Sequence, residues 1–156
     1  MLKKGATKGT PDHTKDQLVW KWLDGQPTSQ DEFGDPTRTT GYALCVYAAN
    51  GRLLSATVPA DGMKWSRMKT KGYKYKEELG TADGVQKILL KGSVENKAKA
   101  VVKGKGAALP DPVLGALALP VTARLMNNDT SVCLEATYDV GDVIKNDTAK
   151  FKAKAQ

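Results

Sequence analysis

The sequence predicts an all-β protein, a single antiparallel β-sandwich of about eight or nine short strands, with a closed barrel as the second choice. Lysines alternate with apolar residues in 71–76 (KGYKYK), 97–105 (KAKAVVKGK) and 150–154 (KFKAK). Because a strand points successive side chains to opposite faces, each stretch has one lysine face and one apolar face. The 15 glycines and the aromatic content of 6% also favour short strands joined by tight turns over helices.

The first half of the chain contains the strongest hairpin signal. Asn50-Gly51 separates the apolar runs 42–48 and 52–58. An Asn-Gly pair favours a type I′ turn, in which both central residues need positive φ. An earlier strand is expected at 17–23 (QLVWKWL), where both tryptophans share one face that is expected to be buried. Residues 24–40, rich in Gly, Pro and Asp, are expected to form a loop.

The second half continues the pattern of short strands. Residues 104–118 are expected to form a loop, because their prolines bar a helix. The final strand has only a weak apolar face, Phe151 and Ala153, and is therefore expected at a sheet edge. The expected strands are 64–76 (one or two, around a turn at Gly72), 85–91, 97–103 (a hairpin with the preceding strand), 121–126, 131–138 and 150–155.

A polar N-terminal tail, residues 1–16, precedes the expected sandwich domain at 17–156. The tail has only Leu2 and Ala6 to bury. Order in such a segment depends on backbone hydrogen bonds, which a sheet edge supplies. The tail is therefore expected to lie either along its own domain or along a neighbouring copy.

The charge of the chain invites anionic partners. A net charge of +7 and a pI near 9.4 suit nucleic acid, anionic polysaccharide or an acidic cell surface. The competing explanation is that exposed strand lysines keep a β protein soluble and block edge-to-edge pairing. No run of 18 apolar residues predicts a membrane span. The first residues lack a signal-peptide pattern, so a processed N-terminus is expected.

No catalytic set is evident in the sequence, and we expect no enzyme. The single histidine, His13, lies in the polar tail, where an exposed and inactive side chain is expected. Without a second histidine, neither a Ser-His-Asp nor a Cys-His arrangement can be assembled elsewhere in the chain.

Aromatic and basic residues in 65–76 are candidate ligand contacts. Trp65 lies beside two basic residues and is expected to be exposed, as in a sugar-stacking platform. Tyr73 and Tyr75 share a strand face, as in single-strand nucleic-acid binders. The alternative is a pair of tyrosines that face the core. The candidate set is Trp65, Arg67, Tyr73, Lys74, Tyr75 and Lys76.

An acidic cluster, Asp31, Glu32 and Asp35, is a weak candidate for a Ca²⁺ site. Carboxylates and loop carbonyls are the oxygen ligands that Ca²⁺ takes in extracellular modules. The alternative is that these acids cap and bend the backbone. No other cofactor is expected.

Two cysteines, Cys45 and Cys133, lie 88 positions apart within expected strands. Free buried thiols, a disulfide and half of a metal site are the alternatives, and zinc is disfavoured because the chain has a single histidine.

The segments KWSRMKTKGYKYKE, NKAKAVVKGKGAALPDP and SVCLEATY resemble an uncharacterised β-rich module of secreted proteins of delta-proteobacteria. The resemblance is clearest over residues 64–155. It implies a β-rich fold and an extracellular location, and it carries over no activity or site residue. The implied oxidising location favours the Cys45–Cys133 disulfide over two free thiols.

Together these observations lead to a functional expectation. We expect a non-catalytic structural or adhesive module of a secreted protein, with self-assembly as one form, in which residues 1–16 add a strand to the next copy. The alternative is a binding module for anionic polysaccharide that uses the lysine-rich strand faces. Single-stranded nucleic acid is a less favoured partner, because the expected location is extracellular.

Overall fold

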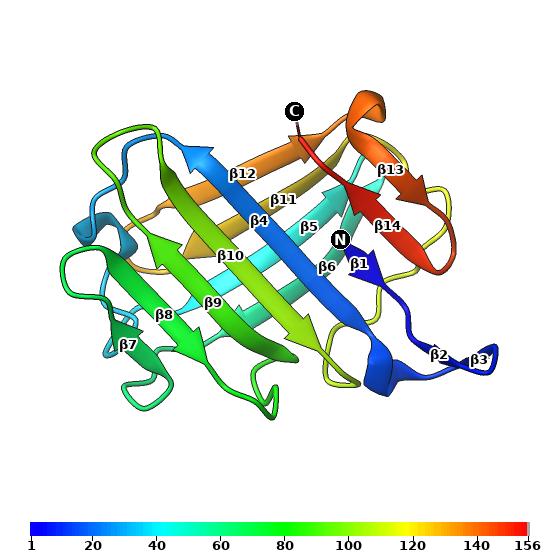
Figure 1. Cartoon of the computed structure of the whole chain (residues 1–156), viewed down its shortest axis with the longest axis horizontal. Coiled ribbons are helices and arrows are strands. Elements are labelled where there is room, and N and C mark those ends of the chain that lie inside the picture. Colours follow the sequence, from blue (N-terminus) through cyan, green and yellow to red (C-terminus); the bar gives the residue numbers. More distant parts are fainter. Residues whose placement is uncertain (156) are drawn as a thin grey trace.

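The computed structural model describes residues 1–155 and confirms the all-β class (Figure 1). The strands are β1 (Leu2–Lys3), β2 (Ala6–Thr7), β3 (Thr10–Pro11), β4 (Gln17–Gly25), β5 (Tyr42–Ala48), β6 (Gly51–Val58), β7 (Trp65–Arg67), β8 (Gly72–Lys76), β9 (Val85–Lys91), β10 (Ala98–Lys105), β11 (Val121–Asn127), β12 (Cys133–Tyr138), β13 (Val143–Asn146) and β14 (Lys150–Ala153). The helical elements among these residues are three short 3₁₀ turns, His13–Lys15, Asp31–Phe33 and Val140–Asp142.

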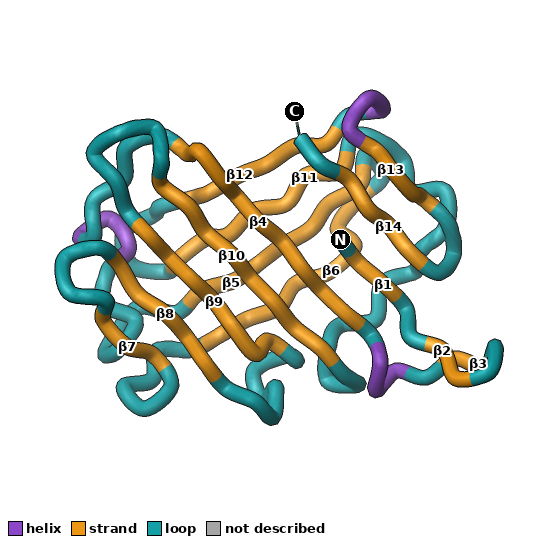
Figure 2. The backbone as a smooth tube through the Cα atoms, in the orientation of Figure 1, coloured by secondary structure: helices purple, strands orange, loops and turns teal. Residues whose placement is uncertain are grey.

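Two large antiparallel sheets form the layers of a sandwich. The first has eight strands in the order β13-β14-β1-β4-β10-β9-β8-β7, and the second has four strands in the order β12-β11-β5-β6. Figure 2 shows the four-stranded sheet behind the eight-stranded one, with its strands running across them. The sheets do not close into a barrel, so the first choice of architecture is confirmed.

The core lies between the two sheets and is built from the inward side of each strand. In β10 the buried residues Ala98, Ala100, Val102 and Gly104 alternate with four outward residues. An aromatic group anchors one end of this core: the Trp65 ring centroid lies 5.6 Å from that of Tyr42 and 5.3 Å from that of Tyr75. Such tilted aromatic pairs add stabilisation beyond the area they bury.

The N-terminal segment is part of the sandwich. β1 lies between β14 and β4, and Leu2 pairs with Phe151 on one side and with Leu18 on the other. The Leu2 side chain is buried, and the Met1 amino group donates a hydrogen bond of 2.7 Å to the Val19 carbonyl. Residues 1–16 are therefore not a tail outside the domain. The β2-β3 hairpin that follows projects from the body (Figure 1).

The position of β14 corrects one sequence expectation. The last strand was expected at an edge, but β13 and β1 flank it on both sides. The sequence did not reveal either neighbour, because β1 has two residues and β13 lies in a polar segment. Strands of two to four residues also explain why the chain has more strands than the expected eight or nine.

The hairpin at Asn50-Gly51 forms as expected, but its turn does not have the expected type. β5 pairs with β6 from Tyr42↔Val58 to Ala48↔Gly51, so Ala49 and Asn50 are the turn residues. Gly51 has φ of +139°, whereas Asn50 is not among the residues with positive φ. The type I′ prediction, which needs positive φ at both turn residues, is therefore wrong.

In residues 1–155, no helix is long and apolar enough to cross a membrane.

Candidate functional site

The outward side of the eight-stranded sheet is the most distinctive surface of the molecule, and we call it the lysine face. Its residues alternate with the buried positions of the same strands, so their direction follows from the period of two. Every charged residue at these outward strand positions is a lysine, except for the exposed Asp24 at the bulged end of β4. The lysines are Lys3, Lys21, Lys74, Lys76, Lys87, Lys91, Lys99, Lys103, Lys105, Lys145, Lys150 and Lys152.

The strand register aligns these side chains in rows across the sheet. Lys76 pairs with Lys87, which pairs in turn with Lys103. Neighbouring strands are about 4.8 Å apart, so such a row places like charges closer than the screening length of physiological salt, about 8 Å. Mutual repulsion in the row is relieved when an anion lies across it.

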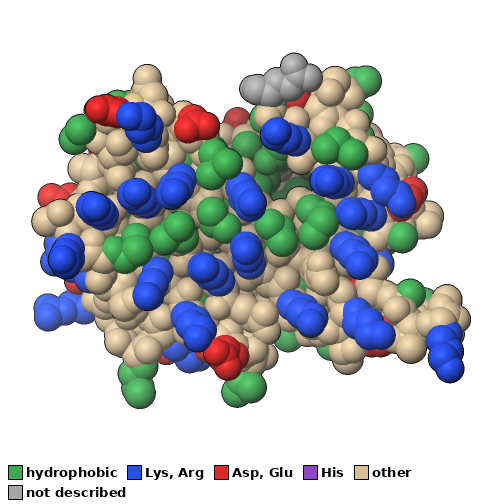
Figure 3. All heavy atoms as spheres, viewed as in Figure 1, with side chains coloured by type: hydrophobic (Ala, Val, Ile, Leu, Met, Phe, Trp, Pro, Cys, Tyr) green, Lys and Arg blue, Asp and Glu red, His purple; other side chains and the backbone are tan. Residues whose placement is uncertain are grey.

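A strip of apolar side chains runs through the lysine face, as Figure 3 shows. Val101 of β10 is paired with Leu89 of β9 and with Lys21 of β4. Val19 lies on the same side of β4, and Leu23 at its end is 53% exposed. The face therefore offers apolar contact between its charges.

Few acids compensate the lysine face. Lys76 lies 3.0 Å from Glu78, and Lys145 lies 3.0 Å from Asp147, and both acids belong to loops at the rim. Among residues 1–155, no ion pair involves Lys21, Lys87 or Lys103 at the centre. The central charges are thus available to an external anion.

The outward side of the four-stranded sheet is different in character. Its Arg124 forms an ion pair with Glu135 and lies over the Tyr47 ring, 5.6 Å from the centroid. The rest of this side is mostly neutral, as in the paired Thr122 and Thr137, with Arg52 of β6 as a second exposed cation. The positive charge of the strands is therefore concentrated on one face of the sandwich.

The candidate aromatic contacts prove to be core residues. Trp65, Tyr73 and Tyr75 are 2%, 4% and 1% exposed, so the expected exposure of Trp65 is wrong and the core-facing alternative is confirmed for the tyrosines. The period of two holds, and it places Lys74 and Lys76 outward on the lysine face instead.

Arg67 is an exposed residue of β7 that donates a hydrogen bond of 3.1 Å to the Gln30 side chain. It pairs in register with Tyr73, whose neighbour Lys74 points to the lysine face. Arg67 therefore lies apart from the lysines, and the candidate set of residues 65–76 does not form one surface.

The acidic cluster is used for local turns. Asp35 accepts a hydrogen bond from the Thr37 amide at 3.1 Å, and Glu32 accepts one from the Ser29 amide at 2.6 Å, which lowers the pKa of Glu32. Within the described residues, these carboxylates do not converge as a ligand set with Asp31. The Ca²⁺ candidate is therefore not assembled, and the backbone-capping alternative describes these residues.

The two cysteines are free, which corrects the disulfide prediction. The strands that carry the cysteines, β5 and β12, flank β11: Cys45 pairs with Arg124 and Cys133 pairs with Met126. Two strand spacings and an offset of two residues along the strands separate the cysteine Cα atoms by roughly 11–12 Å, beyond the limit of about 7 Å for bridged Cα atoms. The cysteines therefore give no support to an oxidising location.

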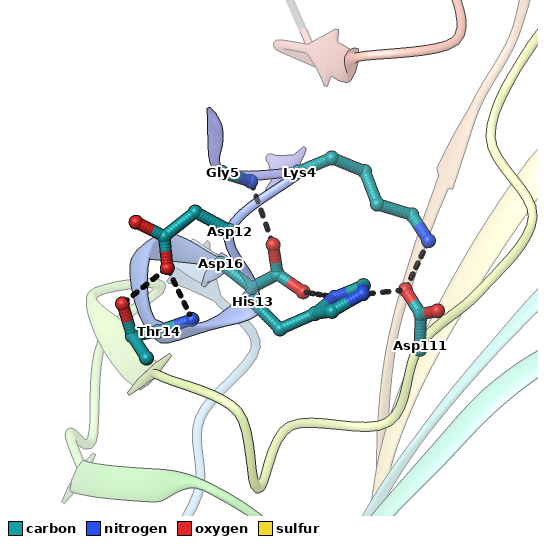
Figure 4. Close-up of polar contacts among 7 residues, drawn as sticks. All are labelled: Lys4, Gly5, Asp12, His13, Thr14, Asp16 and Asp111. Atoms are coloured by element: carbon teal, nitrogen blue, oxygen red, sulfur yellow. Dashed lines mark hydrogen bonds and ion pairs between the residues drawn. The ribbon is translucent and has the colours of Figure 1, made fainter. Parts of the chain in front are cut away.

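The structure also assembles a polar cluster around His13 that the sequence did not reveal (Figure 4). His13 Nδ1 lies 3.0 Å from Asp16 Oδ2 and 3.9 Å from Asp111 Oδ1. The contact with Asp16, with Asp111 close by, raises the pKa of His13 above its ordinary value. Lys4 binds Asp111 and holds the pKa of that carboxyl below its ordinary value. Asp111 is remote in sequence, so nothing in the local pattern predicted this contact.

Neither a protein-family model, nor a curated protein, nor a solved structure matches this chain. The resemblance to a secreted module therefore stays a prediction.

Proposed function

We propose that this protein is a non-catalytic, adhesive module that binds anionic polysaccharide through the lysine face. One observation carries the proposal: with the single exception of Asp24 at the bulged end of β4, the charged residues at the outward strand positions of the eight-stranded sheet are all lysines. A lysine row that only protected a sheet edge would lie on the edge strands β13 and β7. Most of these lysines lie on interior strands, where no edge needs protection.

The chemistry of the face favours an extended polymer over a small ligand. Lysine ammonium groups are point charges without the fork geometry of arginine, so they recognise charge density more than a particular group. The face spans eight strands, roughly 30–35 Å across at the usual strand spacing. Binding is expected to be distributed over many weak contacts and to weaken steeply with salt.

Polysaccharide is favoured over nucleic acid by the residues between the lysines. Single-strand binders stack bases on exposed aromatic rings. The apolar strip of the lysine face consists of Val19, Leu23, Leu89 and Val101, and the nearby aromatic residues face the core. An extracellular location, implied by the sequence resemblance, points to the same class of partner.

Self-assembly by strand addition is the less favoured form of a structural role. The expectation depended on residues 1–16 needing a sheet edge. In this chain β1 already pairs with β4 and β14 of its own domain. The N-terminal segment therefore has its hydrogen-bond partners without a neighbour.

A matched pair of triple variants tests the proposal. Lys21, Lys87 and Lys103 are changed to Gln at the centre of the face, and the exposed Lys8, Arg52 and Lys69 are changed to Gln elsewhere, so both variants lose the same charge. With about 1 kcal/mol per lysine near an anionic surface, the central variant is expected to bind heparin about 100-fold more weakly. The peripheral variant is expected to change affinity much less.

Titrations with heparin, a polyuronate and oligo-dT at several salt concentrations complete the test. Equal losses in both variants would show that net charge, and not the lysine face, governs binding. Tighter binding to oligo-dT than to either polysaccharide would overturn the choice of partner.

A further inference from the structure

We propose that His13, Asp16 and Asp111 form a binding site for a divalent transition-metal ion, with Zn²⁺ as the probe. The site is independent of the lysine face. It joins the 3₁₀ turn that precedes β4 to the loop that follows β10. Among residues 1–155, these three form the group whose ligand atoms all lie within 4.8 Å of one another.

The spacing of the ligand atoms fits a zinc ion. Zinc bonds of about 2.0–2.1 Å to nitrogen and oxygen in a tetrahedral arrangement place two ligands about 3.3 Å apart. The distances from His13 Nδ1, 3.0 Å to Asp16 Oδ2 and 3.9 Å to Asp111 Oδ1, lie on either side of that value. The ligand atoms of the two aspartates lie within 4.8 Å of each other, so rotation of the exposed His13 and Asp111 side chains around the buried Asp16 carboxylate would complete the geometry, with water as the fourth ligand.

Asp16 is oriented for this role by the backbone. Its side chain is 9% exposed, and its Oδ1 accepts a hydrogen bond of 2.6 Å from the Gly5 amide. That contact fixes the carboxylate and leaves Oδ2 directed at His13 (Figure 4). Ligands of protein metal sites are commonly held by such an outer hydrogen bond.

Charge supports the assignment. Two carboxylates converge on one imidazole, and Lys4 is the cation that balances them in this structure. The Lys4 side chain is 26% exposed and lies on a flexible stem, so its ammonium group can move into solvent when a divalent cation takes its place. Lys4 is therefore a competitor of the metal, which gives the proposal a distinctive consequence.

Bound metal would fasten the N-terminal segment to the body of the sandwich. Gly5 and Lys4, which follow β1, both contact carboxylates of the site. Asp111 belongs to the segment 106–120, which connects β10 to β11. The ion would thus replace the Lys4–Asp111 and His13–Asp16 contacts by three coordinate bonds, while the buried Gly5–Asp16 hydrogen bond stays in place.

Calorimetric titration of the metal-free protein with Zn²⁺ tests the proposal. The experiment uses a Cys133→Ser background, because Cys133 is an exposed thiol that could bind zinc elsewhere. The parent is expected to bind one equivalent and His13→Ala to bind at least tenfold more weakly, while Asp12→Asn, a neighbouring acid outside the set, is expected to match the parent.

The Lys4→Gln variant separates a metal site from a structural cluster. It is expected to bind Zn²⁺ more tightly than the parent, because the competing ammonium group is gone, and to gain more in melting temperature on zinc addition. A cluster with a purely structural role would be weakened by Lys4→Gln and would be indifferent to zinc. Absence of zinc binding in both the parent and Lys4→Gln, or equal binding by His13→Ala, would overturn the proposal.

Discussion

Two glycines with nearly the same φ allow the cost of an unfavourable backbone conformation to be distinguished from the cost of a packing collision. Gly72 at the start of β8 has φ of +144°, and Gly51 at the start of β6 has φ of +139°. A Cβ added at Gly72 would collide with the Leu90 carbonyl of the neighbouring strand, whereas one added at Gly51 has nothing within 4 Å. Both positions disfavour a side chain, but only Gly72 is pressed against another backbone.

We therefore expect Gly72→Ala to be more destabilising than Gly51→Ala. The shared positive φ costs each variant a similar amount, and the collision adds about 1–3 kcal/mol for Gly72→Ala. Urea unfolding of the two variants and the parent measures this difference directly. Equal free energies of unfolding would mean that β8 and β9 separate easily, and that Gly72 is needed only for its φ.

Individual residues also show how much of the candidate site could be predicted from the sequence. Alternation correctly placed Tyr73 and Tyr75 on one side of a strand and Lys74 on the other. It carried no information on which neighbours the strand would pair with, so the surroundings of Trp65 were misjudged. The Trp65 side chain packs between two tyrosines, and its indole nitrogen donates a hydrogen bond of 3.1 Å to the Pro59 carbonyl.

At the scale of elements, long strands were predictable and short ones were not. The strands at Tyr42–Ala48 and Val85–Lys91 match the expected ranges, because each is a seven-residue run rich in apolar side chains and bounded by turn residues. β1 has two residues, so its place between β4 and β14 depends on tertiary pairing alone. The same limit concealed the His13 cluster, which forms only when β1 and the segment after β10 are in place.

The short β1 strand is expected to depend on a single buried side chain. Leu2→Ala should lower the free energy of unfolding by about 2–5 kcal/mol, the usual cost of removing a buried leucine side chain. It should also speed amide exchange along β4 and β14, since both strands pair with β1. Lys3→Ala is the matched control, because Lys3 is exposed and its backbone pairing is unchanged.

Hydrogen exchange and urea unfolding of both variants check this expectation. If Leu2→Ala behaved like Lys3→Ala, β1 would not contribute to the stability of the sheet. The N-terminal segment would then be free to pair with a second copy, and the assembly hypothesis would regain its basis.

At the scale of the whole molecule, the sandwich has two chemically distinct sides. The lysine face covers the eight-stranded sheet, while the opposite side carries Cys133 and the Arg124–Glu135 pair. The alternating lysines in the sequence predict that individual strands have a lysine side. That most of these strands belong to one sheet follows only from the topology. A polymer bound to the lysine face should leave the other side open to solvent.

This separation predicts a one-sided footprint. With heparin bound, acetylation should slow at Lys21, Lys87 and Lys103, because their ammonium groups contact the polymer. The alkylation rate of the exposed Cys133, on the other side of the sandwich, should stay unchanged. Mass spectrometry of the modified peptides, with and without heparin, measures both reactions in one sample.

Lys8, at the tip of the β2-β3 hairpin, serves as an internal control. Equal protection of Lys8 and the central lysines, or slowed alkylation of Cys133, would mean that the polymer wraps the molecule by net charge alone. A footprint confined to the lysine face would instead fix the orientation of the module on its ligand, with the four-stranded sheet pointing away.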